Sequence, residues 1–75
     1  EFTNVRRWIV NNLDNDPSRI YRRIYDSLYD NLDNRTIPNA VLVLADYSYK
    51  SAFVADQEIN LLACMTELMQ NCEFK

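Results

Sequence analysis

Apolar residues recur along the chain at the three-to-four-residue spacing of helices, and no segment alternates long enough with a period of two to suggest a sheet. Polar residues and two prolines interrupt this pattern around Asp14–Pro17, Asn31–Thr36 and Asp56. The pattern therefore predicts an all-α fold. We expect a compact bundle of four to five helices in a single domain over residues 1–75, with helices over about 4–13, 17–30, 38–54 and 57–72.

Residues with helix-starting chemistry stand at each predicted beginning. Thr3 is placed to cap the first helix, Asp16 and Asp56 are good N-caps for the second and fourth, and Pro17 suits a first helical position. Pro38 again falls in a first turn. The boundary at Asp16 and Pro17 is the clearest of these, because two independent signals meet there.

The second predicted helix carries an apolar stripe over nearly half its circumference. One interpretation is a helix wedged between two neighbours of its own bundle. The other is that its tyrosine edge faces another subunit, since tyrosine combines apolar area with a hydroxyl suited to a wet rim. The candidate interface residues are this edge and two aromatic residues of the third helix: Tyr21, Tyr25, Tyr29, Tyr49 and Phe53.

The opposite face of the second helix is basic. Arg19, Arg22 and Arg23 lie there, and Arg22 is placed to pair with Asp26 one turn later. A solvated face is one interpretation, because exposed ion pairs contribute little to stability. Contact with an acidic partner or a phosphate is the other, and these arginines form the candidate polar contact face.

The third predicted helix is apolar over most of its circumference. Small side chains, among them Ala45 and Ala52, occupy one broad arc, and only Asn39, Asp46 and Lys50 form a polar strip. Asp46 and Lys50 have the spacing of an ion pair. A helix of this kind is typical of the centre of a bundle. We therefore predict that it is the hub, and that larger residues at Ala45 or Ala52 are poorly tolerated.

The first and fourth helices have simpler patterns. Val5, Trp8 and Ile9 begin a short amphipathic stripe in which Trp8 is the main anchor. The fourth helix contains methionines that fit either a gap-filling role in the core or an adaptable peptide-binding surface. Its predicted buried side comprises Ile59, Leu61, Leu62, Met65, Leu68, Met69 and Cys72.

The two cysteines, Cys64 and Cys72, fall in one predicted helix, separated by about 12 Å of rise. That separation is too long for a disulfide, and reduced thiols in the cytoplasm are the better interpretation. With no second pair of cysteines, the chain offers no predicted zinc site.

Composition removes most kinds of catalysis. The chain has no glycine for a phosphate loop and no histidine for a nucleophile system, and its formal net charge is −3. Five aspartates stand close together in the sequence, but they lack the pattern of a calcium loop and fit solvated acids. These are Asp14, Asp16, Asp26, Asp30 and Asp33. We predict no enzymatic activity, metal or cofactor for this segment, and we find no apolar run long enough to span a membrane.

Two segments carry a family resemblance. Residues 45–63, ADYSYKSAFVADQEINLLA, resemble the C-terminal collar domain of sliding-clamp loader subunits, in particular those of T-even-type bacteriophages, and are more distantly similar to the small subunits of replication factor C. Residues 17–29, PSRIYRRIYDSLY, resemble the preceding helix of that domain. Val54 stands where the replication factor C relatives tend to have glycine, so we expect a differently shaped helix end.

The resemblance implies a fragment of a larger protein. Such subunits carry an AAA+ ATPase module before the collar, and five collars form a ring that holds the loader around primer-template DNA. ATP and magnesium would belong to the missing module, and the partners of the chain would be sibling subunits, with the sliding clamp and DNA reached through the whole complex. A phage protein of this kind would work in the host cytoplasm, and the fragment alone could form homo-oligomers.

Two other classes of function stay open. One is a free-standing helical adapter or regulator that binds another protein. The other is a nucleic-acid binder that uses Arg6, Arg7 and the arginines of the second helix, although the acidic balance of the chain disfavours it.

Overall fold

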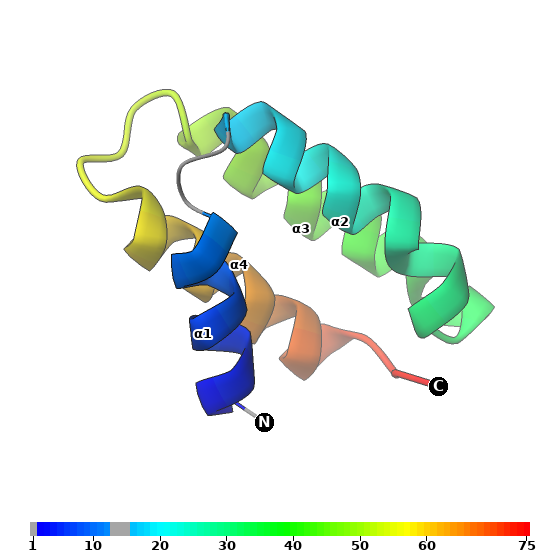
Figure 1. Ribbon diagram of the computed structural model, residues 1–75. Helices are drawn as coiled ribbons and strands as arrows, with labels where there is room; N and C mark the ends of the chain where they lie inside the picture. The colour runs from blue at the N-terminus through cyan, green and yellow to red at the C-terminus, as the bar shows by residue number, and fades with distance from the viewer. Residues whose placement is uncertain (1, 13–15) are drawn as a thin grey trace.

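Helices make up most of the chain, in agreement with the predicted all-α fold. The computed structural model describes residues 2–12 and 16–75, and Figure 1 shows how the helices are arranged. Within those residues the only β-type pairing is an isolated antiparallel bridge between Leu32 and Phe74. The elements in chain order are α1 (Phe2–Asn12), α2 (Pro17–Asn31), the short 3₁₀ helix η1 (Asn34–Thr36), α3 (Ile37–Lys50) and α4 (Gln57–Asn71).

Local side-chain chemistry explains where α2 and α4 begin. The carboxylate of Asp16 accepts a hydrogen bond from the backbone N–H of Ser18 at 2.9 Å, and Pro17 stands at the start of the helix. Asp56 accepts from the N–H of Ile59 at 3.1 Å. Each cap satisfies a donor that has no partner within the first turn of its helix. Both predicted boundaries are confirmed.

Two other boundaries differ from the prediction. Helix α1 already includes Thr3, which is therefore not its cap. Helix α3 ends at Lys50 instead of continuing to residue 54. The Ser51 hydroxyl donates to the carbonyl of Ser48 at 2.6 Å, and Gln57 Nε2 donates to the Ser51 carbonyl at 2.8 Å. These bonds stabilise the turn that follows α3 and satisfy carbonyls of its last turn.

The turn after α3 needs no residue with positive φ. The N–H groups of Phe53 and Val54 both bond to the carbonyl of Lys50, at 2.9 and 3.1 Å. Throughout the described residues no backbone has positive φ. The chain therefore makes its helix ends without the left-handed conformation that favours glycine.

Three helices form the core, fewer than the predicted bundle of four to five. Helix α3 packs against both α2 and α4, and α1 packs against α4 at one side. Every side chain described as buried comes from these three helices or from the residues that flank them. The core comprises Ile20, Tyr21, Ile24, Leu28, Leu32, Ile37, Ala40, Val43, Leu44, Leu61, Cys64, Leu68 and Cys72.

Helix α1 is attached mainly through one aromatic side chain. Trp8 is half-buried and packs against the core, as the predicted anchor should, whereas Val10 is exposed. The side chains of Val5, Arg6 and Ile9 lie outside the described residues, as do residues 13–15 with Asp14.

A buried amide connects the three core helices. Asn60 of α4 donates from Nδ2 to the Tyr21 hydroxyl of α2 at 2.9 Å and to the Tyr47 carbonyl of α3 at 3.2 Å. The Tyr47 hydroxyl donates in turn to a carboxylate oxygen of Glu67 on α4 at 2.8 Å. Because buried polar groups are costly without partners, these bonds fix the alignment of the three helices.

The chain after α4 folds back on the end of α2. The N–H of Asp33 donates to the carbonyl of Glu73 at 2.8 Å, and the N–H of Lys75 donates to the carbonyl of Asn31 at 2.9 Å. Phe74 lies between these two bonds, still half exposed. Cys64 and Cys72 are buried free thiols. No helix within the described residues has the length and hydropathy needed to cross a membrane.

Candidate subunit interface

The side of α3 that faces away from α2 and α4 is apolar and uncovered. At 100° per residue the exposed apolar side chains of α3 up to Tyr49 fall on one arc away from the buried side of the helix, and Ala52 and Phe53 follow in the turn after it. Leu42 is 72% exposed, Tyr49 71% and Phe53, in the following turn, 72%. We call this set the outer face of α3: Pro38, Val41, Leu42, Ala45, Tyr49, Ala52 and Phe53.

This exposure corrects the predicted role of α3 as the hub of the bundle. Ala45 and Ala52 were expected in close helix contacts, but both are exposed. Only the opposite side, with Ala40, Val43 and Leu44, is buried. An apolar circumference predicted a helix surrounded by others, whereas among residues 2–12 and 16–75 the main packing partners of α3 are α2 and α4, on its buried side. Small side chains at Ala45 and Ala52 instead leave the outer face open to close approach by another helix.

Aromatic side chains form one end of the outer face. The rings of Tyr49 and Phe53 lie 5.3 Å apart with their planes tilted by 55°. This tilted geometry is favourable for aromatic pairs. The pair presents a large apolar area to solvent.

A polar border follows one edge of the outer face. Lys50 Nζ lies 3.0 Å from the Asp46 carboxylate, as predicted from their spacing. The ammonium also lies 5.1 Å from the centre of the Tyr47 ring. A polar rim beside an apolar centre is typical of protein–protein interfaces.

A shallow hollow borders the other edge, between α2 and α3, with a volume of about 310 Å³. Tyr25 of α2 and Val41 and Ala45 of α3 line it together with Arg22. The Arg22 guanidinium lies 5.1 Å from the centre of the Tyr25 ring and pairs with Asp26 at 3.1 Å. The outer face is therefore continuous with a groove that has aromatic and basic walls.

The predicted tyrosine edge of α2 does not form one surface. Tyr21 is buried, and burial raises the pKa of its hydroxyl to about 12. Tyr25 is half-buried in the groove, and Tyr29 is exposed. Tyr21 thus belongs to the core, where its hydroxyl accepts a hydrogen bond from Asn60 of α4. Of the candidate interface residues, Tyr49 and Phe53 lie together on the outer face, with Tyr25 beside it.

The arginines of α2 are also separated. Arg19, Arg22 and Arg23 are all exposed, but Arg22 lines the α2–α3 groove and Arg23 lines a different cleft, toward α1 and α4. They lie on one polar side of α2 as predicted, although they border different hollows. The predicted Arg22–Asp26 pair is confirmed.

Sequence reasoning missed part of the site. Ala45 was assigned to the interior, and Ile59 of α4 was expected on the buried side but is 67% exposed. Ile59 lines a second shallow hollow, between α3 and α4, with Tyr47 and Leu62. One sequence signal could have indicated the exposed positions. The apolar surface of α3 extends around more of the helix than two neighbouring helices can bury.

Two titratable groups behind this face, Tyr47 and Cys64, have raised pKa values. The hydrogen bond to Glu67, with partial burial, raises the pKa of the Tyr47 hydroxyl to about 12. Burial raises the pKa of the Cys64 thiol to about 12, so it stays protonated and poorly nucleophilic at neutral pH. Across residues 2–12 and 16–75, no three acidic or cysteine side chains gather in a way that would hold a metal ion.

Comparisons of the chain with protein-family models, curated proteins and solved structures found no match. The functional argument therefore depends on the residues and their geometry.

Proposed function

We propose that this chain is an assembly domain, the collar of a phage sliding-clamp loader subunit, and that the outer face of α3 packs against a sibling subunit. The observation that carries the proposal is the contiguous apolar surface with three large side chains more than two thirds exposed: Leu42, Tyr49 and Phe53. Scattered apolar residues on a surface are ordinary, but a contiguous patch with a polar border marks an interaction site.

The position of the resemblance supports the same surface. Residues 45–63 span the second half of α3, the turn and the first half of α4. That segment includes Tyr49 and Phe53 of the outer face and Ile59 beside the second hollow. The resembling segment therefore contains part of the outer face, Tyr49 and Phe53, whereas Leu42 lies just before it.

In this proposal the chain performs no chemistry itself. ATP and magnesium bind to an AAA+ module in the parent protein, and the collar holds several such modules in a ring around primer-template DNA in the host cytoplasm. The apolar character of the outer face suits a permanent contact, because obligate interfaces resemble a domain core cut in half.

Self-association of the chain provides the first test. Sedimentation velocity over a wide concentration range should show a reversible oligomer, and Leu42→Ser should weaken it at least tenfold. Val10→Ser is the matched control, since it also removes an exposed apolar side chain but on α1. A chain that stays monomeric at all concentrations, or equal weakening by both variants, would contradict an assembly surface at α3.

The parent gene provides the test of the clamp-loader identity. An upstream P-loop sequence in the same reading frame is the expected result. A start codon immediately before Thr3 would overturn the collar and favour the free-standing adapter.

A further inference from the structure

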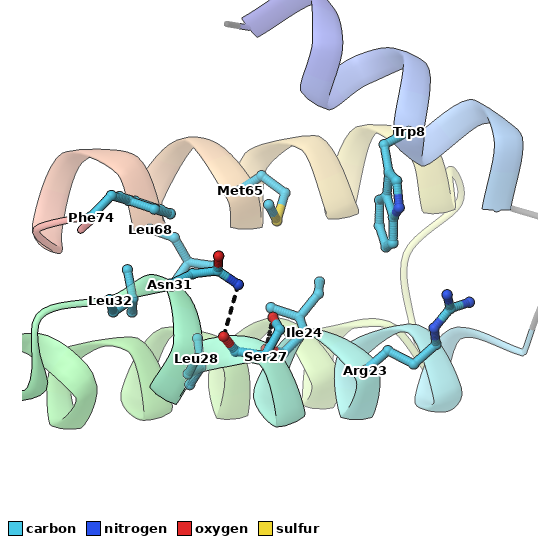
Figure 2. A pocket seen from close by; sticks show the side chains of 10 residues that line it. All are labelled: Trp8, Arg23, Ile24, Ser27, Leu28, Asn31, Leu32, Met65, Leu68 and Phe74. Carbon is cyan, nitrogen blue, oxygen red and sulfur yellow. Dashed lines mark hydrogen bonds between the residues drawn. The ribbon is translucent and has the colours of Figure 1, made fainter.

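The hollows of the domain differ in how much of their apolar lining is exposed. Figure 2 shows the cleft between α2 and α4, which is lined by Leu28, Leu32 and Leu68 and has Phe74 at one end. These three leucines are at most 4% exposed, so the chain itself already buries them. The second hollow, between α3 and α4, has a volume of about 420 Å³ and contains Ile59, which is 67% exposed. Ile59 therefore gives the second hollow a large apolar side chain that a partner can still bury.

The lining of the second hollow changes from apolar to polar along α4. The Glu67 carboxylate already accepts a hydrogen bond from the Tyr47 hydroxyl at 2.8 Å. A carboxylate has two oxygens and can accept further hydrogen bonds. The hollow therefore combines an apolar part with groups that can bond a buried hydroxyl. Its α4 lining comprises Ile59, Leu62 and Ala63, followed by Thr66, Glu67 and Gln70.

We propose that the second hollow of one copy of this chain receives the outer face of α3 of another copy, so that the contact joins two different surfaces. This inference rests on the proposed function, which makes the outer face a contact with a sibling, and it adds where on the sibling that face binds. Tyr49 and Phe53 are 71% and 72% exposed and project from the outer face. A projecting aromatic pair fits a hollow better than an identical projecting pair, because well-packed interfaces need complementary shapes.

The two surfaces also match in polarity and charge. The Phe53 ring is apolar and suits the part of the hollow that contains Ile59. The Tyr49 hydroxyl needs a hydrogen-bond partner when it is buried, and Glu67 can accept from it. Lys50 follows Tyr49 on the polar border, so docking would bring its positive charge toward the acid of the hollow.

The aromatic pair supplies only part of the area that a specific contact needs. Aromatic side chains bury about 150–250 Å² each, so Tyr49 and Phe53 together contribute on the order of 300 Å² at their present exposure. A standard interface buries about 800 Å² on each partner. The rest of the outer face, including Leu42 and the small Ala45, must therefore contact the other copy as well.

A contact between two different surfaces has a consequence that a symmetric contact lacks. Each copy that joins leaves its own hollow or its own outer face available to a further copy, so association continues beyond the pair. A contact of the outer face with itself would stop at two copies.

Mixing two variants tests this arrangement. Leu42→Ser alters the outer face and Ile59→Ser alters the hollow, and each alone is expected to weaken self-association at least tenfold in sedimentation velocity. An equal mixture should form pairs again, because Ile59→Ser keeps an intact outer face and Leu42→Ser keeps an intact hollow. These pairs should not grow, since both remaining surfaces are altered.

The matched control mixes Leu42→Ser with Tyr49→Ser. Both changes lie on the outer face, so every copy keeps its hollow but none has an intact outer face, and no pairs are expected. The side chains replaced in the three variants are at least 67% exposed, so the fold should be retained, which circular dichroism verifies.

Unchanged self-association of Ile59→Ser would overturn the second hollow as the receiving site and leave the outer face as an interface. Absence of pairs in the mixture of Leu42→Ser and Ile59→Ser, or pairs in the control mixture, would also overturn it. A wild-type chain that stays monomeric at all concentrations would contradict both this inference and the proposed function.

Discussion

The two sides of α3 have almost the same apolar character but different surroundings. Leu44 on the inner side is 5% exposed, whereas Leu42, two residues earlier, is 72% exposed. Ala40 is fully buried and Ala45 is exposed. The inner side stabilises this chain by burial, while the outer side would contribute free energy only when a partner covers it. The apolar pattern of a helix thus identifies the surfaces that become buried. It does not specify whether another part of the same chain or a partner molecule buries them.

A pair of leucine substitutions tests this comparison most strongly. Leu44→Ala should destabilise the fold by about 2–5 kcal/mol, because it leaves a cavity in the core. Leu42→Ala should change the free energy of unfolding by less than about 0.5 kcal/mol, since its side chain is already in water. Urea unfolding followed by circular dichroism measures both. Similar losses for the two variants would show that the outer face is covered within the chain.

Enlarging the two alanines tests the same contrast in the opposite direction. Ala40→Leu should cost about 1–3 kcal/mol by overpacking the core. Ala45→Leu should leave the stability of the monomer unchanged and weaken self-association, because a larger side chain prevents close approach at the outer face. Thermal unfolding and sedimentation of the same samples measure the two effects. Strong destabilisation by Ala45→Leu would restore the hub interpretation of α3.

Alkaline pH should lower the stability of the packing between the inner side of α3 and the helices α2 and α4. The pKa values of Tyr21, Tyr47 and Cys64 are raised to about 12 in the folded chain, so these groups keep their protons after the unfolded chain has begun to lose them. Their contribution to stability is complete below about pH 9 and is lost as the pH rises toward 12.

Urea midpoints measured from pH 7 to 11 are expected to be level at first and then to fall. Tyr47→Phe should fall less steeply than the wild type, because one of the groups has been removed. An identical fall in both proteins would contradict the assignment of alkaline instability to Tyr47.

The polar border of the outer face, formed by Asp46 and Lys50, should contribute least to the free energy of unfolding. Lys50→Gln removes the pair with Asp46, whose two side chains are each about half exposed. The expected cost is below about 0.5 kcal/mol and should vanish at high salt. Urea unfolding at two salt concentrations tests this. A loss several times larger would indicate that the border supports the fold.

Helix starts and nearby ion pairs could be predicted from the sequence because their causes are local. Asp16, Pro17 and Asp56 act on residues within one turn, and the Arg22–Asp26 pair needs only the helix itself. The end of α3 was harder, since it depends on Gln57 reaching back across the turn to Ser51.

The candidate interface was only partly predictable. Tyr49 and Phe53 were identified, but Tyr21 was assigned to the same surface although it is buried. Its partner, Asn60, lies 39 residues away, so no local pattern connects them. The available hint was Asn60 itself, a polar residue one helical turn before Cys64 within an otherwise apolar stripe.

The Asn60 amide also limits the alternative folds open to this chain. Small and aliphatic side chains pack almost equally well after a shift of one helical turn, about 5.4 Å, so an apolar core alone would leave several registers close in energy. A shifted α4 would carry the amide away from the Tyr21 hydroxyl and the Tyr47 carbonyl and leave buried polar groups without partners. We infer that Asn60 makes one register of α4 more stable than the shifted registers, and so selects a single arrangement of the helices.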